Sequence, residues 1–384
     1  MDLKLKTNRR VRIAPVEENR WVVKIGSALL TDNGRGLDRD AISRWVNQIS
    51  ALQQQGMDIV LVSSGAIAEG LSRLGWSSRP IEIPRLQAAA AVGQMGLMQV
   101  YETSFNHNGI RSAQILLTHD DFANRQRYLN IEATLRALIQ LRAVPIINEN
   151  DTVSTEEICF GDNDMLAALV ANMVAADRLI ILTDQQGLYT KDPRLSQDVE
   201  LISAVSVDDE RLLAMAGGSS KWGRGGMASK VKAARMFALS GGVTTIASGR
   251  TENVLERIRS GQAIGTALLP GEKRLLKRKQ WLAGHLKTRG ILFLDAGAAQ
   301  AVAMCGGSIL PVGVTAIHGN FGPSEMIQIQ DIEGRYVARG LSNYSAREMS
   351  QIISSSVSMK NFGVRPTGVK ELVHRRNIVL DPYQ

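Results

Sequence analysis

Short unbroken apolar runs recur along the first two thirds of the chain, and small or polar residues follow each run. Such runs are typical of strands that are buried on both faces of a parallel sheet. Longer segments with apolar positions at helical spacing lie between them. Apolar runs begin the segments 20–30 and 57–71, and they make up the segments 111–117, 143–150, 177–184 and 243–249. The segments with helical spacing are 38–56, 85–109, 128–142, 163–176 and 227–242. This alternation predicts an α/β fold around a mostly parallel sheet with helices on both faces.

The pattern changes near residue 270. A charged connector leads into short strand-like pieces, among them "EMIQIQDIEGRYVARG", in which "DIEGR" is a hairpin-turn signal. The piece "SAREMSQIISS" has helical spacing. We therefore expect a basic extension at 1–19, an α/β domain at 20–272, a linker at 273–287 and a small, mostly β domain at 288–384.

The composition is that of a soluble globular protein. The 384 residues are 44% apolar and 21% charged, and the mean hydropathy is −0.06. No apolar run reaches the ~18 residues of a membrane span, and the N-terminal segment lacks the apolar core of a signal peptide. The two cysteines, Cys159 and Cys305, lie too far apart for a CxxC site. These features predict a cytoplasmic protein without membrane segments.

Positive charge gathers at the C-terminal end. Residues 273–384 carry 15 Lys and Arg against 7 Asp and Glu, whereas the rest of the chain is neutral. This asymmetry is compatible with an RNA partner, for which "KRLLKRK" and "HRR" could contact phosphates. A solvated basic linker explains the same charges, and no aromatic residues interleave with them as in a single-strand platform. RNA binding therefore stays one of two open alternatives.

Polar residues follow the predicted strands, where a parallel sheet binds its ligands. A second candidate segment, 217–230, is rich in glycine and ends on Lys230 at the start of a helix. Such a segment offers backbone N–H groups to phosphates, although it is no Walker A loop and could be an ordinary surface loop. Two lysines, a glycine-rich segment and an acidic cluster at 149–164 suit phosphoryl transfer, with Mg²⁺ carried by the nucleotide.

The five histidines have no ligand spacing, so we expect no resident metal.

Several motifs occur in the order found in the amino acid kinase family. They are "VVKIGSALL", "VSSGAIAEG", "AAVGQMGLMQ", "LLTHDDFANRQRYLN", "PIINENDTV", "GDND", "LLTDQQGLYTKDPR" and "GRGGMASKVKAA". The chain resembles this family from about residue 20 to 265, and its tail resembles a PUA domain. The resemblance implies a three-layer sandwich around a mostly parallel sheet. It also implies ATP-dependent phosphorylation of the γ-carboxylate of L-glutamate, the first step of proline synthesis, with feedback inhibition by proline and assembly into dimers or tetramers.

The resemblance also implies a role for individual residues. Lys24 and Lys230 would be the catalytic lysines, and Asp162 the carboxylate that orients them. The substrate-binding residues would be Ser64, Gly65, Ala66, Asp151 and Asn163. The nucleotide-binding residues would be Lys24, Thr183, Asp184, Arg224, Gly225, Gly226, Met227, Ala228, Ser229 and Lys230. Arg224 departs from the family pattern, which has a small residue there.

The segment "INENDTV" with "GDND" bears on which acid is the substrate. Asp151 would hold the substrate's ammonium group while nearby amides meet its carboxylates. A kinase for another small acid, such as N-acetylglutamate or aspartate, remains an alternative, because related kinases vary in this segment. A third hypothesis is an RNA-binding or RNA-modifying protein in which the PUA-like tail carries the function. This hypothesis leaves both lysines and the glycine-rich segment unexplained.

Overall fold

The computed structural model describes residues 18–31, 36–153, 163–193, 196, 199–217, 226–271, 288–323, 325–361 and 371–380. The chain divides into two compact units, Met1–Asp121 with Gln126–Glu272 and Phe122–Arg125 with Lys273–Gln384. The expected linker at 273–287 and its basic "KRLLKRK" stretch lie outside the described residues. Only two residues of the expected N-terminal extension, Glu18 and Asn19, are described.

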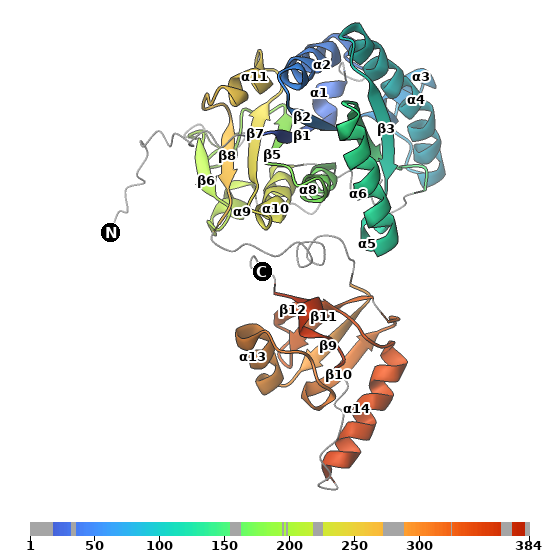
Figure 1. Ribbon diagram of the computed structural model, residues 1–384, viewed down its shortest axis with the longest axis vertical. Coiled ribbons are helices and arrows are strands. Elements are labelled where there is room, and N and C mark those ends of the chain that lie inside the picture. The colour runs from blue at the N-terminus through green and yellow to red at the C-terminus, as the bar shows by residue number, and fades with distance from the viewer. Residues whose placement is uncertain are drawn as a thin grey trace, which may run out of the picture. The chain divides into compact units, whose positions relative to one another are not determined.

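An eight-stranded sheet forms the middle layer of the first unit (Figure 1). Its strands are β1 (Arg20–Ile25), β2 (Asp58–Val62), β3 (Ser112–Leu117), β4 (Val144–Glu149), β5 (Arg178–Thr183), β6 (Ala204–Ser206), β7 (Val243–Ser248) and β8 (Thr266–Leu269). They lie in the order β3-β4-β2-β1-β5-β7-β8-β6, and only the β7–β8 pair is antiparallel. The predicted, mostly parallel sheet is therefore confirmed. The short strands β6 and β8 were not expected from the sequence.

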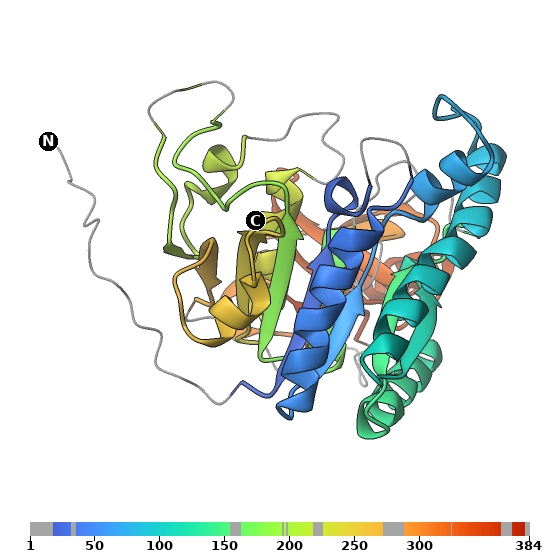
Figure 2. The ribbon, with the colours of Figure 1, turned by 90° about the horizontal axis from the view of Figure 1, so that it is seen from above.

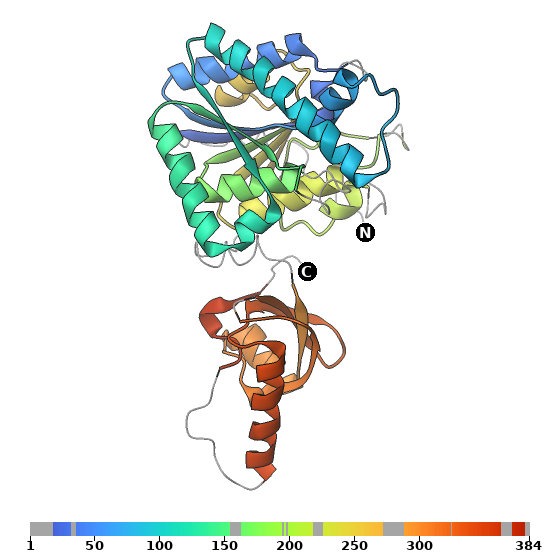
Figure 3. The ribbon, with the colours of Figure 1, turned by 90° about the vertical axis from the view of Figure 1, so that its right-hand side faces the viewer.

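Helices cover both faces of this sheet. They are α1 (Ser27–Leu30), α2 (Arg39–Gln54), α3 (Ala66–Arg73), α4 (Ile83–His107), α5 (His119–Ala123), α6 (Arg125–Gln140), α8 (Asn163–Met173), α9 (Leu212–Met215), α10 (Met227–Ala238) and α11 (Val254–Arg259). Figure 3 shows α2 and α4 on one face and α6, α8 and α10 on the other. Figure 2 shows α2, in blue, running along the sheet. Every position of β4 and β5 is buried, as the three-layer arrangement requires.

Helices α3 and α4 pack unusually closely because glycines face each other's backbone. A Cβ atom at Gly93 of α4 would overlap the carbonyl oxygen of Ala66, and one at Gly70 of α3 would overlap the carbonyl oxygen of Ala89. Gly65, which precedes α3, has a φ of 96°, a conformation that side chains rarely adopt. The contact holds the start of α3 against the middle of α4, next to the carboxyl end of β2.

The second unit is built on a five-stranded sheet in the order β10-β9-β11-β12-β13. Its elements are β9 (Gly290–Leu294), α13 (Ala296–Cys305), η1 (Pro311–Gly313), β10 (Val314–Gly319), β11 (Met326–Asp331), β12 (Tyr336–Leu341), α14 (Ala346–Asn361), η2 (Arg375–Asn377) and β13 (Ile378–Val379). The expected hairpin joins β11 and β12 and turns at Gly334, whose φ is 79°. In the described part of the chain, no helix is long and apolar enough to cross a membrane.

The α3–α4 contact predicts the effect of a single methyl group. Gly93→Ala should lower the free energy of unfolding by about 1–3 kcal/mol, because the methyl group meets backbone that cannot swing aside. Urea denaturation measures this. Gly96→Ala is the matched control, since on the same helix the three atoms nearest to its methyl group all belong to the end of the Arg73 side chain. Equal losses from the two substitutions would contradict the packing argument.

Candidate active site

Two lysines from distant parts of the chain meet at one carboxylate. Lys24 Nζ, on β1, lies 2.5 Å from Asp164 Oδ1, and Lys230 Nζ, on α10, lies 2.9 Å from Asp164 Oδ2. All three side chains are buried, with at most 6% of each exposed. The expected convergence of Lys24 and Lys230 is therefore observed. Their common partner Asp164 belongs to α8.

The electrostatics of this cluster keep Asp164 ionised. Burial, the largest single effect, would raise the pKa of the Asp164 carboxyl, and the charges of Lys24 and Lys230 lower it. Hydrogen bonds from Lys24 and from Ser229 Oγ, 2.7 Å from Oδ2, act in the same direction and bring the pKa to about 2. With one carboxylate and two ammonium groups, the three side chains carry a formal charge of +1. Such a cluster attracts anions.

The helix starts place these groups at the carboxyl edge of the sheet. Asp164 is the second residue of α8 and Lys230 the fourth of α10, and the two helices pack on each other. A helix N-terminus carries partial positive charge on its unpaired N–H groups, so both helix ends add to the field of the lysines. Gly226 directly precedes α10, and a Cβ atom there would meet nothing within 4 Å, so its backbone is open to a ligand.

A chain of amide side chains lies beside the lysine cluster. Asn163 Nδ2 donates to the carbonyl oxygen of Ser63 at 2.7 Å and lies 3.0 Å from both Ser64 Oγ and Asn148 Oδ1. Asn148 Nδ2 donates to Gln94 Oε1 of α4 at 2.8 Å. Asn148 is 2% and Asn163 8% exposed, so these hydrogen bonds fix the amides in place.

The loop between β2 and α3 is held from two sides. Ser63 N donates to the carbonyl oxygen of Ile147 on β4, and Ser63 Oγ lies 3.0 Å from the hydroxyl of Tyr101 on α4. Burial raises the pKa of Tyr101 well above its usual range, against the smaller opposite effect of the Ser63 bond, so the hydroxyl stays neutral. The loop therefore presents Ser64 and the backbone of Gly65 at a fixed position.

The remaining predicted residues fall on the same edge of the sheet. Thr183 ends β5, and its hydroxyl donates to Asp184 Oδ1 at 3.0 Å. Asp151, half-buried, begins the turn after β4. Ala66 opens α3, whereas Met227, Ala228 and Ser229 open α10. Arg224 and Gly225 lie outside the described residues.

The carboxylate between the lysines differs from the expected one. The resemblance assigned that role to Asp162, which lies outside the described residues, whereas the carboxylate that contacts both Lys24 and Lys230 is Asp164. Asp164 follows Asp162 by two positions in "GDND", and the sequence offered no sign that distinguishes them. Gln94 was also missed, because its partner Asn148 lies far from it in the chain.

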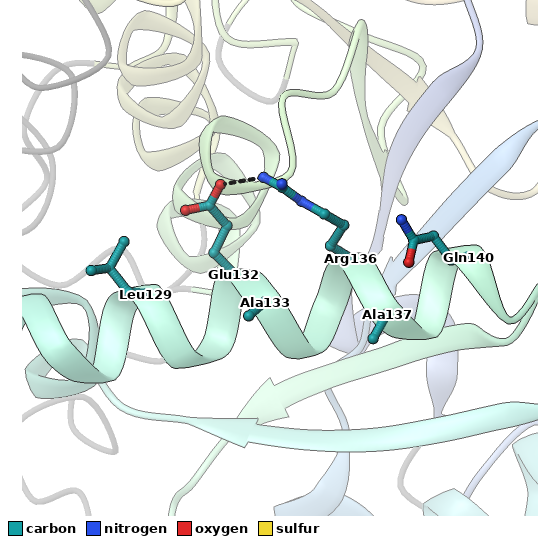
Figure 4. A pocket seen from close by; sticks show the side chains of 6 residues that line it. All are labelled: Leu129, Glu132, Ala133, Arg136, Ala137 and Gln140. Atoms are coloured by element: carbon teal, nitrogen blue, oxygen red, sulfur yellow. Dashed lines mark hydrogen bonds and ion pairs between the residues drawn. The ribbon is translucent and has the colours of Figure 1, made fainter.

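A surface hollow on α6 has a different character (Figure 4). Its lining side chains all come from that one helix, and its two charged residues, Glu132 and Arg136, pair with each other at 2.8 Å. No other charged group of its lining is left to bind a ligand, unlike at the lysine cluster. We therefore place the candidate active site at the carboxyl edge of the sheet.

Comparisons with known proteins agree with this fold. Residues 19–247 match the model of the amino acid kinase family and residues 290–361 that of the PUA domain, so the chain belongs to the amino acid kinase family and carries a C-terminal PUA domain. A protein of Pseudomonas paraeruginosa named "Glutamate 5-kinase" is 56% identical over 94% of this chain and 97% of its own length. Its namesake in Hahella chejuensis is 53% identical over 95% of both chains.

The lowered pKa of Asp164 predicts a pH-dependent stability. At neutral pH, Asp164→Asn should lower the free energy of unfolding by about 3–5 kcal/mol, because two buried ammonium groups lose their counter-charge. The folded-state pKa lies below the ordinary value, so this contribution is full above about pH 4 and lost as the pH falls towards 2. Urea denaturation at pH 6, 4 and 3 should show the difference between wild type and variant shrinking. A difference that stays constant would contradict the assignment.

Proposed function

We propose that this protein is a kinase that transfers the γ-phosphoryl group of ATP to the γ-carboxylate of L-glutamate. The observation that carries the proposal is the Lys24–Asp164–Lys230 cluster at the carboxyl edge of the sheet. The names of relatives more than 50% identical over nearly the whole chain support glutamate as the acceptor. The product would be γ-glutamyl phosphate, the first intermediate of proline synthesis.

The chemistry needs charge neutralisation rather than a general base. A γ-carboxylate is ionised at neutral pH, since its ordinary pKa is about 4.3, so no proton has to leave it. One of its oxygens attacks the γ-phosphorus, a new O–P bond forms, and the bond to the β–γ bridging oxygen breaks to release ADP. Both reactants are anions and repel each other. Lys24 and Lys230 would contact the transferred group and lower that repulsion.

Asp164 would act by keeping the two lysines at one separation. Its two oxygens each bind one ammonium group, so neither lysine can turn away without losing a buried ion pair. The two lysines are therefore already in place to bind a planar phosphoryl group, whose negative charge is shared among its three oxygens during transfer. Mg²⁺ would arrive with the nucleotide phosphates, as part of that substrate.

The two substrates would approach from opposite sides of β1. On one side, β5 ends at Thr183 and Asp184, and the backbone before α10 is open at Gly226, which suits a nucleotide. On the other side, the amides beside β2 and β4 suit carboxylates, and Asp151 suits an ammonium group. This side holds the residues expected to bind glutamate, and we place proline, as a feedback inhibitor, at the same side. A cytoplasmic location, dimers or tetramers, and RNA binding by the tail stay predictions.

The proposal predicts which acid triggers ATP consumption. ADP release should require L-glutamate and should be at least tenfold slower with aspartate or N-acetylglutamate at equal concentration, because the amide and carboxylate positions fit one chain length and a free ammonium group. A coupled ADP assay with the purified full chain measures this. Turnover only with an acid other than glutamate would overturn the proposal.

The lysine cluster predicts a second, local result. Lys230→Ala should reduce kcat at least 100-fold, because the transition state loses one of its two positive contacts. Lys232→Ala is the matched control, since Lys232 lies on the exposed side of the same helix and should leave kcat within about twofold of wild type. Near-normal turnover in the Lys230→Ala variant would exclude a catalytic role for that lysine.

A further inference from the structure

Among the described residues, one buried hydrogen-bond donor beside the amide chain has no acceptor. Gln94 Nε2 is shielded from solvent and has no hydrogen-bond partner among the described residues, whereas Gln94 Oε1 accepts from Asn148 Nδ2. Leaving a buried donor unpaired destabilises the folded protein, because the donor has lost its hydrogen bonds to water. Native proteins rarely keep such a donor unless a ligand or water completes it.

The direction of the Gln94 amide is fixed by the chain of hydrogen bonds. The carbonyl oxygen of Ser63 can only accept, so the group of Asn163 that faces it is the nitrogen. That nitrogen also faces Asn148, which must therefore present its oxygen to Asn163 and its nitrogen to Gln94. Gln94 consequently offers its oxygen to Asn148, and its NH₂ group is the end that remains open.

The position of Gln94 distinguishes the two ends of a bound dicarboxylate. Lys24 lies on β1, Ser63 follows β2, and Asn148 lies on β4, and these strands are consecutive neighbours in the sheet. With about 4.8 Å between neighbouring strands, Asn148 lies roughly 10 Å across the sheet from the strand of Lys24. The two carboxyl carbons of extended glutamate are about 5 Å apart. An acid that lies along this edge with its γ-carboxylate at the lysine cluster and its chain directed over β2 would bring its α-carboxylate to the side of Gln94.

We infer that Gln94 is a specificity-determining residue whose Nε2 group donates a hydrogen bond to the α-carboxylate of the acceptor acid. The inference rests on the proposed function. The neighbouring Gly93 explains the position of Gln94. Because Gly93 has no side chain, α4 packs closely on α3 and brings Gln94 next to the β2–α3 loop. Gln94 thus has two tasks on one side chain: its oxygen holds Asn148, and its nitrogen binds substrate.

The test exchanges the donor for a negative charge. In the Gln94→Glu variant one oxygen can still accept from Asn148, but the other faces the α-carboxylate with a like charge. The KM for L-glutamate should rise roughly 10- to 100-fold, while the KM for ATP stays within about twofold. The second readout uses a glutamate analogue whose α-carboxylate is replaced by an α-carboxamide. The kcat/KM for this analogue, divided by the kcat/KM for L-glutamate, should be about tenfold higher in the variant than in wild type. The NH₂ group of that analogue can donate to the introduced carboxylate.

Two further variants make the result decisive. Gln99→Glu, at an exposed position of the same helix, should leave both KM values and the carboxylate-to-carboxamide ratio unchanged. Gln94→Met keeps the size but removes both the Nε2 donor and the acceptor of Asn148, and it should reduce the preference for carboxylate over carboxamide even if Gln94→Glu folds poorly. A purely structural role would lower kcat/KM for both acceptors equally in both Gln94 variants, which would overturn the inference. If wild type releases no ADP with L-glutamate, the proposed function fails instead.

Discussion

Two lysine ammonium groups can be buried beside each other only if an anion lies between them, because each loses its hydration and repels the other. In this protein the anion is Asp164, with one oxygen on Lys24 and the other on Lys230. The carboxylate stays ionised, with a pKa of about 2, because the two lysines and the hydrogen bond from Ser229 together outweigh the effect of burial. The arrangement of strands, helix starts and loops around the site follows from the need to hold this cluster together.

The fold brings these three side chains together from three separate elements. Lys24 lies next to the last residue of β1, and Asp164 and Lys230 stand in the first turns of α8 and α10. The amide chain from Ser63 to Gln94 lies at the ends of the neighbouring strands. The edge of the sheet therefore has a charged part, at the lysine cluster, and a neutral polar part beside it. Transfer of an anionic group to an acid needs this division: positive charge where the phosphoryl group moves, and neutral donors where the rest of the acid is held.

Much of this could be predicted from the sequence. The apolar runs located β1, β2, β3, β4, β5 and β7, and the order of the motifs pointed to Lys24 and Lys230. The short strands β6 and β8 escaped because three or four residues carry too little periodicity. Asp164 escaped although the start of α8 was predicted correctly, because "GDND" holds two aspartates and the resemblance assigned the role to the first, Asp162. Gln94 escaped because the chain folds it against residues 54 positions away.

A crystal structure with ADP, aluminium fluoride and L-glutamate bound tests the central claim most directly, because the flat fluoride complex imitates a phosphoryl group in transfer. We expect it to lie between a glutamate γ-carboxylate and the ADP β-phosphate, within hydrogen-bonding distance of both Lys24 Nζ and Lys230 Nζ, with Asp164 still bound to the two lysines. A fluoride complex that contacts neither lysine, or lysines that separate from Asp164 and face different directions, would contradict the account.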